Sequence, residues 1–284
     1  MKKYLKLLRV NQWIKNIFIF LPIFFAGKTI DFQIWISLSG GFLAFSCATS
    51  AIYVLNDIID RKEDENHPLK RYRPIASKQI TVKIAGFIGI TVGGIGLGYF
   101  LIFDKGVLPF VLTYVIIMIF YCFFFRKISI LDVIVISIGF VLRLFIGGEL
   151  TNTPISIWII IMVFLLALFI TFSKRRDDLI NEDGQVRESL FDYNLSFINT
   201  VISVLVPIII VTYILYCTAD SNILRVGEHL YLTTLFVIVG FLRYLQLVFV
   251  ENLGGDPVQL FYDDFILKAT VISWMIIFGY LLYV

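Results

Sequence analysis

The chain has 284 residues, of which 59% are hydrophobic and only 16% are charged, and its formal net charge at pH 7 is +3. A soluble domain carries about 25% charged residues, so this composition excludes an ordinary soluble enzyme and predicts an integral membrane protein. The net charge is small, so its placement matters more than its size, and no nucleic-acid partner is expected.

Apolar runs of about 20 residues, the length that crosses a bilayer, recur along the chain. The first run is short and carries Lys15 and Asn16, so it is expected to begin in the membrane interface. No linker separates the runs, and residues 1–284 are predicted to form one domain. The fold class we predict is an all-α, polytopic membrane bundle of nine transmembrane helices, at residues 12–28, 33–57, 81–102, 107–125, 128–147, 155–174, 197–217, 229–250 and 265–283.

Basic residues predict the orientation of this bundle, because loops on the cytoplasmic side carry an excess of Lys and Arg. With the N-terminus inside, 20 of the 24 Lys and Arg residues fall in inside segments, Lys28, Lys105 and Arg225 fall outside, and Arg143 lies within a helix. The pattern predicts a cytoplasmic N-terminus and an outside C-terminus in a prokaryotic cell membrane. It also places the polar loops 58–80 and 174–196 on the cytoplasmic side, where they are expected to cap the active site.

The loop after the second predicted helix begins with four oxygen-bearing side chains. Asn56, Asp60 and Asp64 are spaced four residues apart and would share one face of a helix, and Asp57 lies beside them. Like charges this close repel unless a cation neutralises them, and Mg²⁺ prefers carboxylate and phosphate oxygens. A solvated acidic helix end is the alternative. Polar residues that emerge directly from an apolar helix favour a magnesium–diphosphate site instead.

A basic segment follows directly, reading His67-Pro68-Leu69-Lys70-Arg71-Tyr72-Arg73-Pro74. Cations beside a carboxylate site suit a phosphate that bridges metal and protein, so Lys70 and Arg73 are candidate phosphate ligands. The other interpretation is a loop that binds anionic lipid headgroups. His67 precedes a proline and is expected to be a hydrogen-bonding loop residue.

A second charged segment follows the sixth predicted helix and reads Lys174-Arg175-Arg176-Asp177-Asp178, with Glu182 and Asp183 beyond it. Asp178 and Glu182 are four residues apart and could hold a second metal ion, while Lys174 and Arg175 could bind phosphates. Ordinary charge pairs on a helix that ends at the membrane surface are the alternative.

Further polar residues occur near or inside the predicted helices. Lys15 and Asn16 are either an interfacial anchor or phosphate contacts, and Arg126 is either a topology determinant or a substrate contact. Arg143 lies within the fifth helix and should face the bundle interior; a structural pairing, for which Glu149 is a candidate partner, is as plausible as a substrate contact.

The segment Asn56-Asp57-x-x-Asp60-x-x-x-Asp64 resembles the first aspartate motif of the UbiA superfamily of intramembrane prenyltransferases. The segments Gln12-Trp13-x-Lys15-Asn16, His67-Pro68-x-Lys70-Arg71-x-Arg73-Pro74 and Gly139-Phe140-Val141-Leu142-Arg143 resemble its branch that transfers phosphoribosyl groups to decaprenyl phosphate. Where aromatic prenyltransferases of the superfamily carry a second motif with aspartates four apart, this chain has Asp177-Asp178 and then Glu182-Asp183.

This resemblance implies a Mg²⁺ cofactor, phosphoribosyl diphosphate and a polyprenyl phosphate as substrates, and a lipid bilayer as the environment. The implied metal ligands are Asn56, Asp57, Asp60 and Asp64, and the implied catalytic residues are Asp57, Asp60, Asp64 and Lys70. The substrate-binding residues would be Lys15, Asn16, Asn56, Lys70, Arg73, Tyr121, Arg126, Lys174, Arg175 and Asp178.

Two alternatives stay open. A prenyl diphosphate and an aromatic acceptor, as in quinone biosynthesis, would use the same scaffold, but the density of Lys and Arg fits the four phosphates of the phosphoribosyl reaction better than the two of the prenyl reaction. A transporter would place ionisable residues near the middle of the membrane, whereas this chain places them at helix ends and only Arg143 lies deep.

Overall fold

The computed structural model describes residues 2–26, 32–181, 192–251, 253 and 257–283. Within these residues every regular element is a helix, as the sequence predicts. The chain forms two compact units, one of residues 1–126 and 139–155 and the other of residues 127–138 and 156–284. The prediction of a single domain is not tested by this division.

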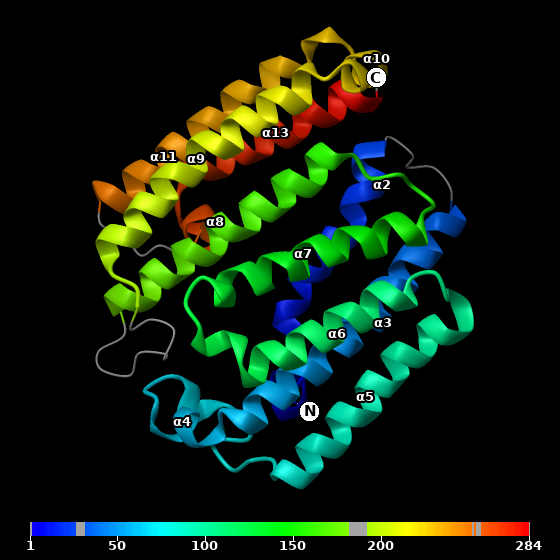
Figure 1. The fold of residues 1–284 in the computed structure, drawn as a ribbon, viewed down its shortest axis with the longest axis vertical. Coiled ribbons are helices and arrows are strands. Elements are labelled where there is room, and N and C mark those ends of the chain that lie inside the picture. The colour runs from blue at the N-terminus through cyan, green and yellow to red at the C-terminus, as the bar shows by residue number, and fades with distance from the viewer. Residues whose placement is uncertain (1, 27–31, 182–191, 252, 254–256, 284) are drawn as a thin grey trace. The chain divides into compact units, whose positions relative to one another are not determined.

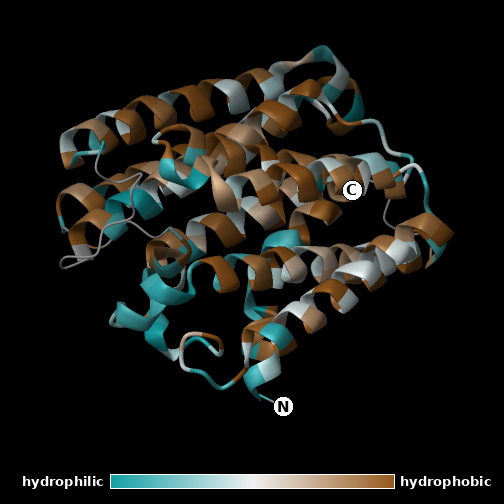
Figure 2. Ribbon diagram, turned by 60° about the horizontal axis from the view of Figure 1, so that its bottom comes forward, coloured by the Kyte–Doolittle hydropathy of each residue, from teal (hydrophilic) through white to brown (hydrophobic). Residues whose placement is uncertain are grey.

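Helices of unit 1 are arranged around α3 (Phe32–Ile59), the longest helix of the chain (Figure 1). α3 packs along α5 (Val82–Phe103) and contacts α6 (Leu108–Phe123) and the 3-10 helix η1 (Val10–Phe20). The remaining elements are α1 (Lys2–Leu7), α2 (Leu21–Ala26), α4 (Arg61–Asn66), the short turn η2 (Lys70–Tyr72) and the part of α7 (Leu131–Leu150) that begins at Gly139. Figure 2 shows the hydrophilic residues gathered on α4 and the turns beside it, whereas the long helices are mainly hydrophobic.

Within its described residues, unit 2 contains the beginning of α7, four further long helices and three short ones. α8 (Ile157–Asn181) packs along α9 (Leu195–Thr218), and α11 (Thr234–Phe249) packs against α9 and α13 (Phe265–Tyr283). The short elements are α10 (Asp220–Val226), η5 (Glu228–Thr233) and α12 (Pro257–Asp263). The core consists of aliphatic and aromatic side chains of α8, α9 and α11, among them Phe169, Ile202 and Leu247.

Seven helices within the described residues are long and apolar enough to cross a membrane. They match seven of the predicted spans, at Phe32–Ile59, Val82–Phe103, Leu131–Leu150, Ile157–Ile180, Leu195–Thr218, Glu228–Phe249 and Phe265–Tyr283. The other two predicted spans, 12–28 and 107–125, correspond to shorter apolar helices at Val10–Ala26 and Leu108–Phe123. An integral membrane protein is therefore confirmed, and the number nine stays a prediction.

Close packing of α5 on α3 depends on Gly96. A Cβ atom added at Gly96 would lie 2.4 Å from the carbonyl oxygen of Ala44 on α3, whereas one added at Gly98 meets nothing within 4 Å. Without a polar solvent to drive helices together, membrane helices associate through such small-residue contacts.

We expect Gly96→Ala to destabilise the protein by about 1–3 kcal/mol, the usual cost of overpacking a filled site. Gly98→Ala is the matched control, because it adds the same methyl group to the same helix in open space, and it should be neutral or slightly stabilising. Thermal unfolding in detergent, followed by loss of the monodisperse peak, measures both. Equal stability of the two variants would contradict this account of the α3–α5 contact.

Candidate active site

Polar side chains of unit 1 gather where α3 ends and α4 begins. α3 ends at Ile59, Asp60 lies at the junction, and helical hydrogen bonds continue across it, because the Asp64 N–H donates to the Asp60 carbonyl at 2.9 Å. The Asn56 side-chain amide donates to the Asp60 carboxylate at 2.8 Å, as their four-residue spacing predicts. The expected common face is therefore partly formed, with Asn56 and Asp60 in contact.

Asp57 is almost fully buried, at 2% exposure, and accepts from two arginines. The Arg73 guanidinium donates to its Oδ1 atom at 3.1 Å, and the Arg9 guanidinium donates to the same oxygen. A buried carboxylate needs such compensation, because an unpaired ion in an apolar interior is strongly destabilising. The sequence predicted Arg73 here but did not predict Arg9.

Asp64 shares Arg73 with Asp57. Arg73 donates to Asp64 Oδ2 at 2.7 Å from the same nitrogen that contacts Asp57. Two aspartates seven residues apart therefore contact one guanidinium group. Burial raises the pKa of the Asp64 carboxyl, and the adjacent Arg73 charge opposes this shift. Burial thus disfavours the ionised form of Asp64, and a second cation beside this carboxyl would favour that form.

Asp60 faces Arg126, which follows α6. The Arg126 guanidinium donates to Asp60 Oδ1, and its second terminal nitrogen lies 3.8 Å from Glu63. The structure therefore brings Arg126, predicted as a substrate contact, to the carboxylate cluster. We call Asp57, Asp60 and Asp64 with Arg9, Arg73 and Arg126 the carboxylate–arginine cluster.

The loop after α4 is held by His67, whose ring nitrogen accepts from the backbone N–H groups of Leu69 and Lys70 at 3.2 and 3.3 Å. This confirms His67 as a hydrogen-bonding loop residue. Lys70 is partly buried, and its charge lies within electrostatic range of Asp64. The loop thus presents Lys70 and Arg73 on the side of the aspartates.

A sharp backbone turn brings Arg9 to Asp57. Arg9 has a φ of 48° and a ψ of 47°, a left-handed conformation that residues other than glycine seldom adopt. Ser50 on α3 holds both sides of this turn, since its hydroxyl donates to the Leu8 carbonyl at 2.8 Å and accepts from the Trp13 indole at 3.0 Å. Positive φ outside glycine is often found where a functional side chain must be aimed.

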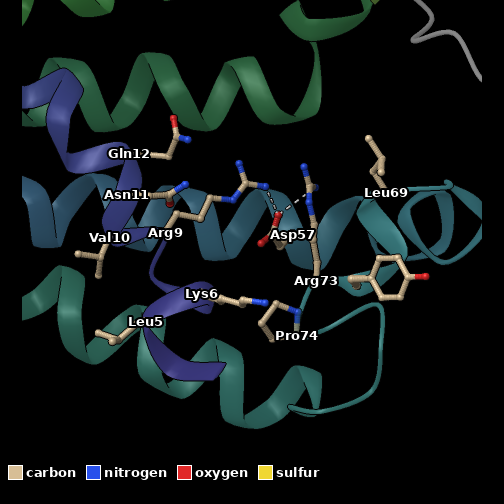
Figure 3. Close-up of a pocket in the computed structure, with 11 residues that line it drawn as sticks. Leu5, Lys6, Arg9, Val10, Asn11, Gln12, Asp57, Leu69, Arg73 and Pro74 are labelled. Carbon is tan, nitrogen blue, oxygen red and sulfur yellow. Dashed lines mark hydrogen bonds and ion pairs between the residues drawn. The ribbon is translucent and has the colours of Figure 1, made fainter. Parts of the chain in front are cut away.

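A cavity of about 600 Å³ lies beside this turn (Figure 3). One wall is the N-terminal segment with Leu5, Lys6 and Arg9, and the opposite wall is the loop with Leu69 and Arg73. Figure 3 shows the Arg9 and Arg73 guanidinium groups converging on Asp57 within it. The cavity therefore adjoins the carboxylate–arginine cluster.

A second polar network lies deeper in unit 1, around Arg143 on α7. The Arg143 guanidinium donates to Asn16 at 2.9 Å, to the Gly139 carbonyl at 2.7 Å and to the Tyr114 hydroxyl at 3.2 Å. It also lies 4.9–5.3 Å from the centroids of the Phe45, Tyr114 and Phe140 rings. Of the two interpretations left open for Arg143, the contacts show the structural pairing, with partners in η1, α6 and α7.

Glu149 is not the partner of Arg143 within the part of the chain that the structure describes. Residues six apart on a helix are separated by about 240° around its axis, and the Glu149 side chain is exposed whereas Arg143 is 4% exposed. Among the predicted substrate contacts, Asn16 is buried and also donates to Ser46 at 2.9 Å, Tyr121 is buried, and Lys15 is partly buried.

The second predicted site lies in unit 2. Arg175 is 2% exposed and donates to Asp132 at 2.8 Å and to Asp178 at 2.9 Å. Tyr193 donates to the other oxygen of Asp132 at 2.9 Å, and burial raises the pKa of Tyr193, which keeps the hydroxyl protonated. Lys174 is exposed on the same helix end. Glu182 and Asp183 lie outside the described residues.

Arg176, next in the chain, connects three elements of unit 2. It donates to Asn199 on α9 at 2.9 Å and to the Val248 carbonyl on α11 at 3.1 Å. Its buried side chain thus stabilises the contact between α8, α9 and α11. Of the three consecutive cations, Arg175 and Arg176 are buried and engaged, and Lys174 is the exposed one.

The donor set at the α3–α4 junction fits Mg²⁺ in kind, since it offers three carboxylates and one amide within nine residues. Within the described residues, however, no three His, Cys, Asp or Glu side chains are arranged to hold a metal ion. The reason is visible in the contacts: each aspartate of the cluster faces an arginine. In this structure the arginines therefore supply the positive charge that the aspartates contact.

Arg9, Asp132 and Tyr193 were not predicted as site or network residues. Arg9 lies 48 residues from Asp57 and carried no local signal beyond its charge. Asp132 did carry a signal, because an acidic residue in the first turn of an apolar helix is costly unless it is paired. Tyr193 could be recognised only from the fold.

These features define a class: a membrane protein that is helical throughout its described elements and pairs aspartates with arginines where a long apolar helix ends. The sequence matches the UbiA prenyltransferase family over residues 16–252. The chain belongs to this family and is therefore a membrane-embedded transferase.

Relatives with assigned names cover nearly the whole chain. The sequence is 26% identical over 279 residues to decaprenyl-phosphate phosphoribosyltransferase from Corynebacterium glutamicum, covering 95% of this chain and 84% of that protein. It is 25% identical to the protein of the same name from Mycobacterium tuberculosis, covering 96% and 92%. A UbiA homolog from Archaeoglobus fulgidus, solved with DMAPP and Mg²⁺, has the same fold, with a TM-score of 0.74 at 18% identity over 99% of both chains.

Proposed function

We propose that the protein transfers a 5-phosphoribosyl group from phosphoribosyl diphosphate to a polyprenyl phosphate and releases pyrophosphate. The observation that carries the proposal is the carboxylate–arginine cluster, in which Arg9, Asp57, Arg73 and Asp64 alternate in contact and Asp60 pairs with Arg126. Arginine binds phosphate oxygens with two parallel hydrogen bonds, and aspartates suit the cation that accompanies a diphosphate. The relatives named decaprenyl-phosphate phosphoribosyltransferase support the same reaction.

Mg²⁺ would be held by Asn56, Asp57, Asp60 and Asp64, and when bound it would neutralise the departing pyrophosphate. Arg73 and Arg126 would bind the diphosphate oxygens with Lys70, and they would stabilise the charge that builds on them as the bond breaks. These arginines lie beside the aspartates, and binding of Mg²⁺ and the diphosphate would replace their ion pairs with contacts to the cation and to the phosphate oxygens. Lys15, Lys174, Arg175 and Asp178 stay candidate substrate contacts from the sequence.

The reaction itself needs little from the protein beyond placement. An oxygen of the lipid phosphate would form a bond to the anomeric carbon of the ribose, and the bond from that carbon to the diphosphate would break, with its electron pair leaving on pyrophosphate. A phosphate monoester is ionised near neutral pH, so no general base is required. The polar loops 58–80 and 174–196 would face the cytoplasm of a prokaryotic cell, as the distribution of Lys and Arg predicts.

An activity assay with the two substrates, the substrate trial, tests the proposal. Purified protein in lipid vesicles with Mg²⁺, polyprenyl phosphate and phosphoribosyl diphosphate labelled in the ribose should move label into the organic phase, with one pyrophosphate released per label transferred. Polyprenol, which lacks the phosphate, is the control acceptor and should stay unlabelled. The alternative is prenyl transfer to an aromatic acceptor, which the family name favours. Absence of lipid-bound label, together with turnover of a prenyl diphosphate and an aromatic acid, would establish that alternative.

A further inference from the structure

The cavity of Figure 3 is lined by charged and apolar groups in a pattern that the proposed diphosphate site does not explain. It contains three cations, Lys6, Arg9 and Arg73, against one carboxylate, Asp57. Arg9 and Arg73 both contact Asp57, and within the described part of the chain Lys6 forms no hydrogen bond or ion pair. The excess of positive charge suits an anion.

Apolar side chains on both walls indicate what that anion is attached to. Leu5 is 48% exposed on the N-terminal wall, and Leu69 and Tyr72 are 78% and 61% exposed on the opposite wall. Sugar phosphates would leave these side chains uncovered. A phosphate on a hydrocarbon chain would use the cations and cover the apolar groups together.

The N-terminal segment has the composition of a chain that lies at a membrane surface. Tyr4 and Leu5 lie between lysines, with Lys2 and Lys3 before them and Lys6 after them, and all five side chains are exposed. Basic residues beside aromatic and aliphatic ones favour the interface between water and lipid. A lipid phosphate lies at that level, so it would reach this cavity without leaving the interface.

The walls of the cavity are firmly held. Leu7 is fully buried against Val54, Ile75 and Ile80, which anchors α1 to α3 and to the loop that follows α4. The Ser50 contacts with Leu8 and Trp13 hold the turn at Arg9. The backbone that carries Lys6 and Arg9 is therefore held in place before a ligand binds, which reduces the entropy lost on binding.

We propose that this cavity binds the phosphate end of the polyprenyl phosphate acceptor, with Lys6 and Arg9 on the phosphate and with Leu5 and Leu69 along the first isoprene units. This inference rests on the proposed function and adds the place of its acceptor. Because Arg9 and Arg73 also contact Asp57, which is assigned to the donor and its cation, the acceptor phosphate would lie next to the donor.

Lys6→Gln tests the assignment, because Lys6 lines the cavity and, within the described residues, forms no ion pair with an aspartate of the carboxylate–arginine cluster. Loss of one charge-assisted hydrogen bond should raise the KM for polyprenyl phosphate about tenfold or more. The KM for phosphoribosyl diphosphate should change less than about threefold. Lys2→Gln is the matched control, since it removes the same charge from the same short helix outside the cavity, and it should resemble the wild type in both constants.

Binding without turnover separates the acceptor from other phosphates. Titration of the wild type with farnesyl phosphate, farnesol or inorganic phosphate should show that farnesyl phosphate binds best, and Lys6→Gln should weaken that binding. A rise in the KM for phosphoribosyl diphosphate alone would assign the cavity to the donor and overturn the inference. An effect of Lys6→Gln that disappears in vesicles without anionic phospholipid would also overturn it, since the cavity would then bind bilayer headgroups. An inactive wild type in the substrate trial would refute the proposed function instead.

Discussion

Asp60→Asn is expected to lower the rate of phosphoribosyl transfer by about 10²–10³-fold, the usual effect of removing one electrostatic group from a reaction centre. Asp60 accepts from Asn56 at 2.8 Å and from Arg126, and its side chain is 14% exposed. Asparagine has nearly the same shape, and its one amide oxygen can still accept from Arg126, so that only the hydrogen bond from Asn56 is lost. The fold should therefore be kept while the negative charge is lost.

The dependence on Mg²⁺ distinguishes a ligand from a structural residue. If Asp60 helps to hold the cation, the Mg²⁺ concentration for half-maximal activity should rise in the variant, and excess Mg²⁺ should restore part of the rate. A residue that only shaped the loop would lower the rate at every Mg²⁺ concentration alike.

Glu65→Gln is the matched control for Asp60→Asn. It removes one carboxylate from α4 outside the cluster, where Glu65 pairs with Arg61 at 3.0 Å in a partly exposed ion pair. Such exposed pairs contribute about 0–1 kcal/mol, so activity and stability should stay near the wild type. Loss of activity in the control equal to that in Asp60→Asn would show that charge on α4 in general, rather than the cluster, sets the rate.

Local sequence patterns predicted the fold well because apolar runs are nearly sufficient to define membrane helices. Seven of the nine predicted spans match helices of membrane-crossing length. The sequence indicated less clearly where α3 ends and α4 begins. Four-residue spacing placed Asn56, Asp60 and Asp64 on one face, whereas the contacts pair Asn56 with Asp60 and bring Asp57 and Asp64 to Arg73.

The sequence could not show which residues far apart in the chain contact one another. Arg9 was counted only as a residue that determines orientation, yet the Ser50 hydroxyl and a left-handed turn aim it at Asp57. Asn16 was grouped with Lys15 by adjacency, but successive residues of a helix point in different directions, and Asn16 faces Arg143 on α7. Such pairings depend on how helices pack, and packing is not a local property.

Arg143→Met should produce a large loss of stability in unit 1, about 2–4 kcal/mol. The buried guanidinium makes three hydrogen bonds and lies over three aromatic rings, and hydrogen bonds to charged groups contribute about 1.5–3 kcal/mol each. Its removal would also leave the Asn16 amide oxygen without this donor in an apolar interior. Removing the buried cation also removes the cost of its desolvation, which works in the opposite direction. Because this cation is well hydrogen-bonded, we expect the net effect to be destabilising.

A double-mutant cycle with Asn16→Leu isolates the interaction. Because replacing both partners of a buried polar pair by apolar groups is much less costly than replacing one, Asn16→Leu with Arg143→Met should be more stable than the sum of the single changes by about 1–2 kcal/mol, within the range for residues in contact. Unfolding by sodium dodecyl sulfate in mild micelles measures all four proteins. The control pair is Asn16→Leu with Gly98→Ala, whose side chains share no contact and whose effects should add. If the Asn16–Arg143 pair were additive as well, the hydrogen bond between them would contribute nothing, and the position of η1 would have to depend on its other contacts, among them the hydrogen bonds of Trp13 and Asn16 with α3.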